Sequence, residues 1–277
     1  MFESIVEGLL DTLKIIPFLF ITFLFLEFIE HKLSHKSTKI LTKNQKFGPF
    51  FGALLGAAPQ CGFSVMAAKL FSNKIITTGT LIAIFLSTSD EMLPIMISEN
   101  ANILDILWII CTKIFIGLVI GLIIDLIYKK KEKVPISKMC EDEHCGCKNH
   151  GIILSSLNHT LKISFFILTA NVIINLVIFF IGENNLSSLL LPKNLLTYFC
   201  ASLIGLIPNC SGSVIITQLY LSNLITPGIL LAGSLTGSGL GLLLLFKTNK
   251  NLKENLSILL ILYIIGVFSG IIIDLFI

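Results

Sequence analysis

The chain has 277 residues, of which 54% are hydrophobic and only 13% are charged, and its formal net charge is +3. With a mean hydropathy of +0.90, it has too few polar side chains to cover the surface of a soluble protein, so the composition predicts an integral membrane protein. All 20 basic residues are lysine, and the absence of the bidentate arginine guanidinium disfavours nucleotides, nucleic acids and other polyanions as ligands.

The N-terminal stretch lacks the features of a secretory signal peptide. Acidic residues stand where a signal peptide has its basic region, and no small-residue cleavage site follows the first apolar run. We therefore expect this apolar run to remain as a membrane helix. The seven cysteines are an odd number scattered between apolar segments and one loop, which indicates free thiols rather than a secreted disulfide framework.

Eight apolar stretches follow one another along the chain. Four are uninterrupted and have the length of about 20 residues that spans a bilayer. Two more reach that length but contain a polar or glycine-rich interruption, and two are divided by Pro and Gly into halves of about 10 to 12 residues, each enough for half a membrane. The uninterrupted stretches are 9–29, 101–128, 156–182 and 256–276, the interrupted ones 77–98 and 226–246, and the divided ones 48–72 and 197–222.

The divided stretches belong to an internal repeat with a constant spacing of 149 positions. Pro59-Gln60-Cys61 returns as Pro208-Asn209-Cys210, and Gly117-x-x-x-Gly121-x-x-x-Asp125 returns as Gly266-x-x-x-Gly270-x-x-x-Asp274. Interrupted helices at corresponding positions of two repeats are typical of secondary transporters. The Gly-x-x-x-Gly pairs predict close packing between helices.

The distribution of lysine predicts the topology. If both divided stretches return to the face from which they enter, four connections on one face hold 15 of the 20 lysines, and the loops of the opposite face hold only Lys193. The lysine-rich face is then cytoplasmic, both termini are extracytoplasmic, and each half has three crossings, an odd number that inverts the second half. The lysine-rich connections are 30–46, 73–76, 129–155 and 247–255.

We thus predict an all-α integral membrane fold of two inverted-topology repeats, each with three spanning helices and one re-entrant helical hairpin, ten helical segments in all. The first repeat covers 1–128, a cytoplasmic loop 129–155, and the second repeat 156–277. Irregular backbone at membrane depth must be buried in protein or line a cavity, so the hairpin tips and the interruptions should meet near the midplane. The predicted substrate-binding residues there are Gln60, Cys61, Ser64, Ser87, Ser89, Asp90, Glu91, Asn209, Cys210, Ser211, Ser213, Thr236 and Ser238.

Asp90 and Glu91 are the strongest indication of substrate charge. A carboxylate at mid-membrane costs several kcal/mol unless it is paired, protonated or bound to a cation. Two interpretations follow: a site for a cation or a coupling proton, or a buried ion pair with Lys113, which lies halfway along 101–128. The second repeat has Gly239-Leu240 at these positions, and this asymmetry favours the functional interpretation.

Thiols form two further candidate sites. Cys61 and Cys210 are either small apolar residues or, together with the carboxylates, ligands for a transition metal or a thiophilic metalloid. The long loop is either a flexible polar segment or a tetrahedral soft-metal site, although its spacing is not that of a zinc finger. Its candidate ligands are Cys140, His144, Cys145, Cys147 and His150. These residues are suited to bind a transition-metal ion. We expect that transport itself requires no cofactor.

Three segments resemble a bacterial family of ten-transmembrane heavy-metal exporters, also described as manganese or arsenic efflux proteins. They are Gly-Ala-Leu-Leu-Gly-Ala-Ala-Pro-Gln-Cys-Gly-Phe-Ser (52–64), Gly-Thr-Leu-Ile-Ala-Ile-Phe-Leu-Ser-Thr-Ser-Asp-Glu (79–91) and Ile-Pro-Asn-Cys-Ser-Gly-Ser (207–213). The resemblance implies metal export, and its ten segments correspond to six crossings plus four half-helices. Ser-Gly-Ser follows Cys210 where Gly-Ser-Ser is expected, a change in turn geometry.

The expected function is therefore a secondary-active exporter of divalent or thiophilic heavy-metal ions that works by alternating access and couples to protons through Asp90 and Glu91. The alternative is a transporter of a small organic solute, such as an amine, an amino acid or an organic anion, which the hydroxyl and amide groups suit equally well. An enzyme is disfavoured because the chain has no paired nucleophile and base and no phosphate-binding loop. We expect the protein to lie in the bacterial inner membrane, in contact with lipid and without a nucleic-acid partner. The sequence is compatible with either a monomer or a homo-oligomer.

Overall fold

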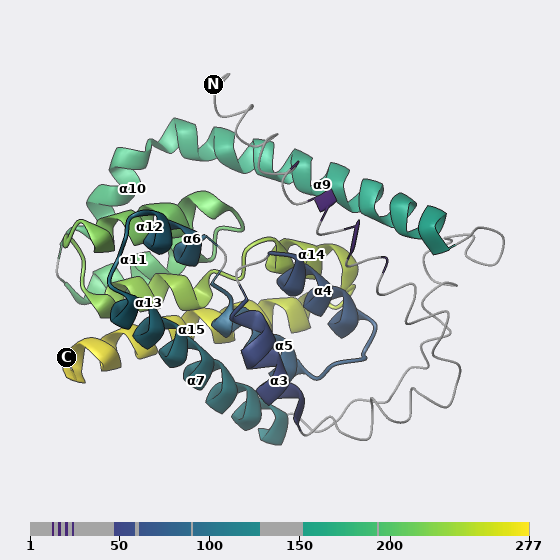
Figure 1. Ribbon diagram of the computed structural model, residues 1–277, viewed down its shortest axis with the longest axis horizontal. Coiled ribbons are helices and arrows are strands. Elements are labelled where there is room, and N and C mark those ends of the chain that lie inside the picture. The colour runs from purple at the N-terminus through teal and green to yellow at the C-terminus, as the bar shows by residue number, and fades with distance from the viewer. Residues whose placement is uncertain are drawn as a thin grey trace.

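Every regular element in the described part of the chain is a helix (Figure 1). The structure is a computed structural model, and it describes residues 47–58, 61–89, 91–127, 152–192 and 194–276 with isolated positions between 13 and 24. The helices are α3 (Gly48–Gly56), α4 (Cys61–Ser72), α5 (Thr78–Ser87), α6 (Met92–Ser98), α7 (Ile103–Ile127), α9 (Ile152–Ile181), α10 (Glu183–Leu190), α11 (Leu195–Gly205), α12 (Cys210–Leu221), α13 (Pro227–Thr236), α14 (Leu240–Thr248) and α15 (Leu252–Phe276).

Five segments of the described chain are long and apolar enough to cross a membrane, which confirms a multi-pass membrane protein. They are Thr78–Ser98, Ile103–Ile127, Ser156–Ile178, Pro227–Thr248 and Leu252–Phe276. Each coincides with a stretch predicted from the sequence. The predicted span 9–29 lies largely outside the described residues.

Both predicted interruptions are present, and the helix boundaries beside them recur at the repeat spacing to within one residue. α5 ends at Ser87 and α6 begins at Met92, while α13 ends at Thr236 and α14 begins at Leu240. Likewise α4 and α12 begin at the cysteines of the two Pro-x-Cys turns, 149 positions apart. The local sequence therefore dictates the same sequence of short helices in both halves.

The two short helices α5 and α13 form the core. Every residue of α5 from Gly79 and of α13 from Gly228 to the helix end is buried. α5 packs between α3 and α7, and α13 packs between α11 and α15. Burial on all sides explains why neither helix has a polar stripe.

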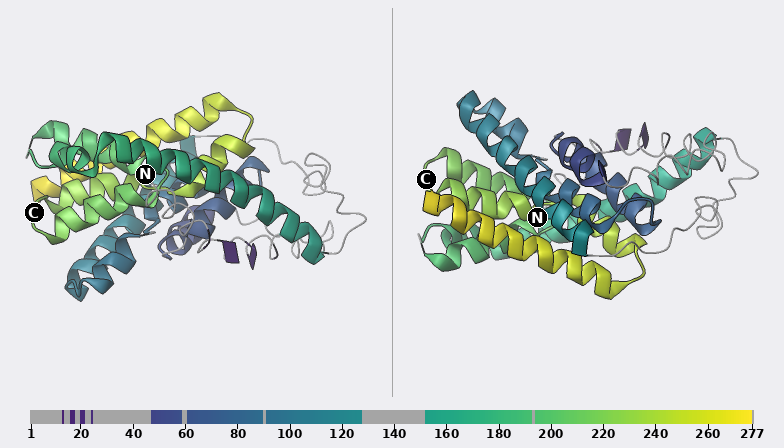
Figure 2. Two further views of the ribbon diagram at one scale, coloured as in Figure 1. Left: turned by 90° about the horizontal axis from the view of Figure 1, so that it is seen from above. Right: turned by 90° about the horizontal axis from the view of Figure 1, so that it is seen from below.

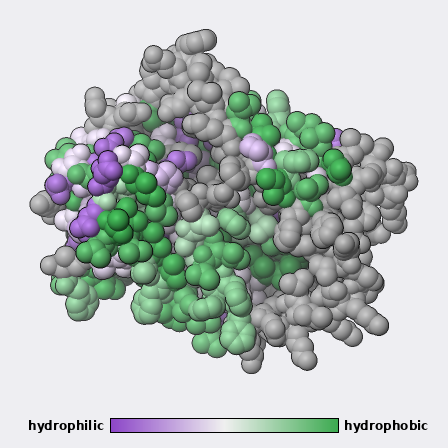
Figure 3. All heavy atoms as spheres, viewed as in Figure 1, coloured by the Kyte–Doolittle hydropathy of each residue, from purple (hydrophilic) through white to green (hydrophobic). Residues whose placement is uncertain are grey.

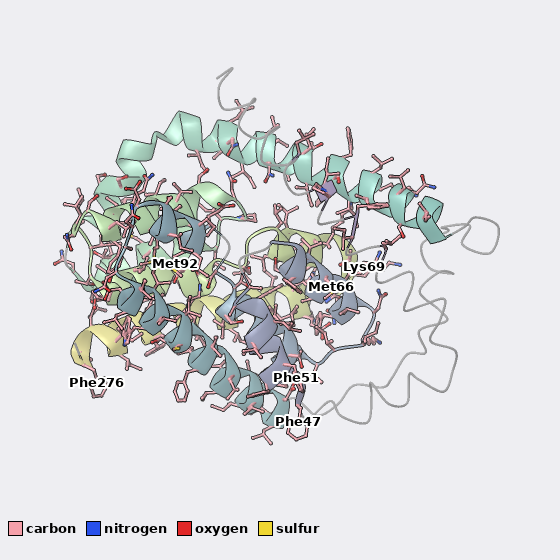
Figure 4. The ribbon with its side chains drawn as sticks, viewed as in Figure 1. Phe47, Phe51, Met66, Lys69, Met92 and Phe276 are labelled. Atoms are coloured by element: carbon pink, nitrogen blue, oxygen red, sulfur yellow. The ribbon has the colours of Figure 1, made fainter. Side chains whose placement is uncertain are left out.

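The outer helices expose apolar side chains, as a lipid-facing surface requires. Phe47 directly before α3, Phe51 on α3 and Phe276 at the end of α15 point outward (Figure 4), with exposed fractions of 62%, 59% and 87%. Hydrophobic atoms cover much of the described surface in Figure 3, and hydrophilic residues gather near its left edge. This reversal of the usual soluble pattern agrees with a bilayer as the solvent.

Glycines allow the core helices to approach their neighbours closely. A Cβ added at Gly121 would lie 2.7 Å from the carbonyl oxygen of Gly79, and one added at Gly270 would lie 2.5 Å from that of Gly228. These contacts join α7 to α5 and α15 to α13. The predicted role of the Gly-x-x-x-Gly pairs in close helix packing is therefore confirmed.

The N-terminus of each core helix is capped by an aspartate from the neighbouring long helix. Asp125 on α7 accepts hydrogen bonds from Thr77 Oγ1 at 2.6 Å and from the Gly79 backbone N–H at 2.9 Å. Asp274 on α15 accepts the same two bonds in the second half, from Thr226 Oγ1 and the Gly228 N–H. A carboxylate at a helix N-terminus satisfies free N–H groups and the positive end of the helix dipole.

The halves are also interlocked and differ in direction. α4 of the first half packs against α14 of the second, and α12 of the second packs against α6 of the first. α7 runs from left to right in Figure 1, whereas its counterpart α15 runs from right to left, as Figure 2 also shows.

We predict that Asp125→Ala lowers the free energy of unfolding by about 1 to 3 kcal/mol, because it leaves the Gly79 N–H without its acceptor. Asp274→Ala should cost more, since Tyr198 Oη also donates to Asp274 at 2.6 Å. Thermal unfolding of the purified protein in detergent measures both. The control is Glu99→Ala at an exposed residue, and an equal effect of all three changes would contradict the capping role.

Candidate functional site

The last residues of α3 and α11 contact the core helices of their own halves. A Cβ added at Gly56, the last residue of α3, would lie 2.6 Å from the carbonyl oxygen of Ile84 in α5. One added at Gly205, the last residue of α11, would lie 2.9 Å from the carbonyl carbon of Gly233 in α13. Glycine is needed here because the ends of α3 and α11 meet the backbones of α5 and α13 directly.

α4 and α12 both approach the break between α13 and α14. Gly241, at the start of α14, lies so close to α4 that an added Cβ would be 2.7 Å from the Cβ of Ser64. Ser213 Oγ in α12 lies 3.4 Å from the position of a Cβ at Gly237. The first contact crosses between the halves and the second does not, so α4 of the first half and α12 of the second half adjoin the same break.

Lys113 joins the ends of α5 and α13. It lies midway along α7, its side chain is 1% exposed, and its ammonium donates to the carbonyl oxygens of Thr88 and, at 2.8 Å, of Ser234. Thr88 directly follows α5, and Ser234 lies in the last turn of α13. Both carbonyls belong to the negative ends of helix dipoles, which an ammonium stabilises. The structure gives Lys113 two backbone acceptors, one from each half. Asp90, a carboxylate that the sequence offers as its ion-pair partner, lies outside the described residues.

Hydroxyl groups at the breaks fall into two classes. Ser87 Oγ and Ser89 Oγ donate to carbonyls of α5, and Thr236 Oγ1 donates to the Ser202 carbonyl oxygen at 2.9 Å. Ser234 Oγ and Ser238 Oγ, by contrast, are buried and have no hydrogen-bond partner within the described part of the chain. Buried polar atoms are rarely left unsatisfied, so this pair is available to a bound ligand.

Asn209, which lies between α11 and α12, forms a hydrogen bond with α9. Asn209 Nδ2 donates to Asn175 Oδ1 and, at 3.2 Å, to Ser211 Oγ. Asn175 belongs to a buried polar stripe on α9 whose spacing of mostly four residues places it on one helix face. The stripe consists of Ser156, Thr160, Ser164, Asn171 and Asn175.

The structure thus places nine predicted site residues. Six are buried, namely Ser64, Ser87, Ser89, Asn209, Thr236 and Ser238. Three are half-buried, namely Glu91, Ser211 and Ser213. Ser234 and Asn175 were missed. The available signal was a polar residue within an apolar span, which usually faces the protein interior.

Most of the predicted metal ligands lie outside the residues that the structure describes. Gln60, Asp90, the side chains of Cys61 and Cys210, and the whole of 140–150 lie outside the described residues. Within the residues that are described, no three His, Cys, Asp or Glu side chains gather as a metal site. Met66 on α4 and Met92 on α6 lie apart (Figure 4), so these two thioethers do not form a common ligand set.

Comparison with known proteins adds one finding. Residues 2–190, more than half of the chain, match the model of a protein family described as "Putative, 10TM heavy-metal exporter". At a conventional level of significance, no curated protein and no solved structure matches the chain.

We predict that Gly241→Ala destabilises the protein by about 1 to 3 kcal/mol, because the new methyl group meets both the side chain and the backbone of Ser64. The matched control is Gly237→Ala in the same break, where the nearest atom lies at an ordinary contact distance of 3.4 Å. Thermal unfolding in detergent compares the two. Equal stability of both variants would show that α4 and α14 are not packed this closely.

Proposed function

The chain belongs to the family of 10TM heavy-metal exporters, and on this premise we propose that it is a secondary-active exporter of divalent or thiophilic heavy-metal ions that works by alternating access. The observation that carries the proposal is the convergence of two interrupted helices, α5 and α13, on the ammonium of Lys113. Broken helices that meet inside the membrane are where secondary transporters bind their substrates and coupling ions.

The proposed topology is that of two inverted repeats with re-entrant hairpins. Three features support it: the lysine-rich connections, the helix boundaries repeated at 149 positions, and the opposite directions of α7 and α15 in Figure 1. On this topology α3–α4 would enter from the cytoplasmic face and α11–α12 from the outer face. We place the protein in the bacterial inner membrane with both termini outside.

The interlocked halves suggest how access alternates. α4 is held against α14 and α12 against α6, so a movement of one half displaces the opposite hairpin with it. We propose that α5 and α13 with their capping long helices form the two rigid units. The breaks between them then open alternately to either face, since substrate at the midplane is reached from whichever side is unblocked.

Most of the ligands and coupling groups that we propose for the site are residues identified from the sequence. Cys61 and Cys210 would supply soft thiolate ligands at the two hairpin turns, and Asp90 and Glu91 would carry the coupling proton or a cation. The buried hydroxyls of Ser234 and Ser238 would complete the coordination of an ion that has lost its water. The Cys/His loop would deliver metal ions to the cytoplasmic entrance, with a bound transition metal as its cargo.

One observation favours the alternative, a small organic solute. A buried ammonium within reach of α13, together with two unsatisfied hydroxyls of the same break, is suited to a carboxylate or another oxyanion. An organic anion would therefore bind on the α13 side of Lys113. Competition by carboxylates for metal flux distinguishes the two substrate classes.

We predict that a Cys61→Ala/Cys210→Ala variant loses flux of thiophilic metals in proteoliposomes, because both soft ligands are removed. Flux of Mn²⁺, Cd²⁺ and arsenite should be measured in parallel. Cys111→Ala is the control, since Cys111 is a free, exposed cysteine on α7. Full flux of every metal in the double variant, or loss of uptake restricted to organic anions, would refute thiol coordination.

We also predict that Asp90→Asn or Glu91→Gln abolishes transport while leaving the protein folded, because the charge needed for coupling is lost and the side-chain volume is kept. Proteoliposome flux with an imposed pH gradient measures the effect, and size-exclusion chromatography in detergent reports on folding. Unaltered flux in both variants would overturn the assignment of the carboxylates.

A further inference from the structure

Two backbone carbonyl oxygens converge on the ammonium of Lys113. The carbonyls of Thr88 and Ser234 end two helices from different halves, and they point at one position that the ammonium fills. Carbonyl oxygens at interrupted helix ends, with the negative dipole ends behind them, are the ligands that secondary transporters use for a coupling Na⁺. An ammonium carries the same single charge and has three N–H donors for such oxygens.

The duplicated half shows that the fold itself does not need this lysine. The position 149 residues later is Leu262, in α15, which is also fully buried. α15 packs against α13 in the same way as α7 packs against α5, so leucine satisfies the packing at this point. The charge of Lys113 therefore serves something other than helix packing, because a buried ammonium is costly unless its partners compensate.

We propose that Lys113 is a tethered cation that permanently occupies a monovalent-cation site formed by the carbonyl oxygens of Thr88 and Ser234. The proposal builds on the proposed transport function: a carrier with this site filled by its own side chain has no need of Na⁺ or K⁺ to draw the two broken helices together. The ammonium holds the ends of α5 and α13 across the boundary between the halves.

Removal of the side chain should expose an empty cation site with a defined ligand. Lys113→Ala deletes three methylene carbons and the ammonium, which is the volume and charge of an n-propylammonium ion. It leaves two buried carbonyl oxygens without their donor, so the variant should be less stable than the wild type. A small cation that can donate hydrogen bonds should then bind the variant and restore part of that stability.

The test is thermal unfolding of purified Lys113→Ala in detergent with increasing concentrations of propylammonium, Na⁺, K⁺ or tetramethylammonium chloride at constant ionic strength. We expect propylammonium to raise Tm saturably and to recover most of the loss, and tetramethylammonium, which has no N–H donor, to have no effect. Leu262→Ala is the matched control, because it makes an equivalent deletion of buried side-chain carbons on the twin helix without removing an ammonium, and it should not respond. The absence of a saturable response in Lys113→Ala, or an equal response of Leu262→Ala, would overturn the proposal.

A wild-type measurement keeps the proposal testable if Lys113→Ala does not fold. Tm of the wild-type protein should be the same in Na⁺, K⁺ and choline chloride, because its cation site is already filled. A saturable stabilisation by Na⁺ or K⁺ would overturn the tethered-cation role. These stability readouts do not depend on flux, so a failure of the proposed metal export would leave them unchanged and would be recognised separately.

Discussion

Satisfaction of backbone polar groups in an apolar solvent is the constraint on which the architecture depends. Interrupted helices leave free carbonyls and N–H groups, and lipid offers them no partner. The interrupted helices α5 and α13 are therefore buried between their neighbours from their second residues onward. Their N-termini are capped by Asp125 and Asp274, and the carbonyls of Thr88 and Ser234 near their C-terminal ends accept from Lys113. The polar interior is thus the direct consequence of the breaks.

Small residues determine how tightly this interior closes. Gly79 and Gly228 allow the long helices to lie directly on the core helices, and Gly241 brings α14 onto Ser64 of the opposite half. Met92 stands at the position equivalent to Gly241 in the first half. A bulky side chain at one break and none at the other makes the two cross-half pairs unequal. The same scaffold can thus be tight on one side of the site and more open on the other.

The sequence predicted the helices and the places where they break, because hydrophobic length and the position of Pro, Gly and Ser are local properties. The repeat also indicated equivalent roles for Asp125 and Asp274, and both aspartates accept hydrogen bonds from a threonine and a glycine at equivalent positions. The partners of Lys113 could not be predicted, because backbone carbonyls carry no residue identity and become acceptors only where a helix ends. Ser234 was missed for a related reason: its hydroxyl is unsatisfied only in the packed structure.

Departures from the duplication are where function is expected to lie. A duplicated fold supplies two equivalent sets of backbone and side-chain groups. Equivalent sets cannot by themselves bind a substrate, bind a coupling ion and hold the helices together as three separate roles. Asp90-Glu91 against Gly239-Leu240, and Lys113 against Leu262, place ionisable groups in the first half alone. Because ionisable groups at membrane depth are costly, each must be compensated by a specific interaction. For Lys113 those compensating oxygens are visible, and one of them comes from the half that lacks the charge. The charged half and the uncharged half are therefore complementary parts of one site.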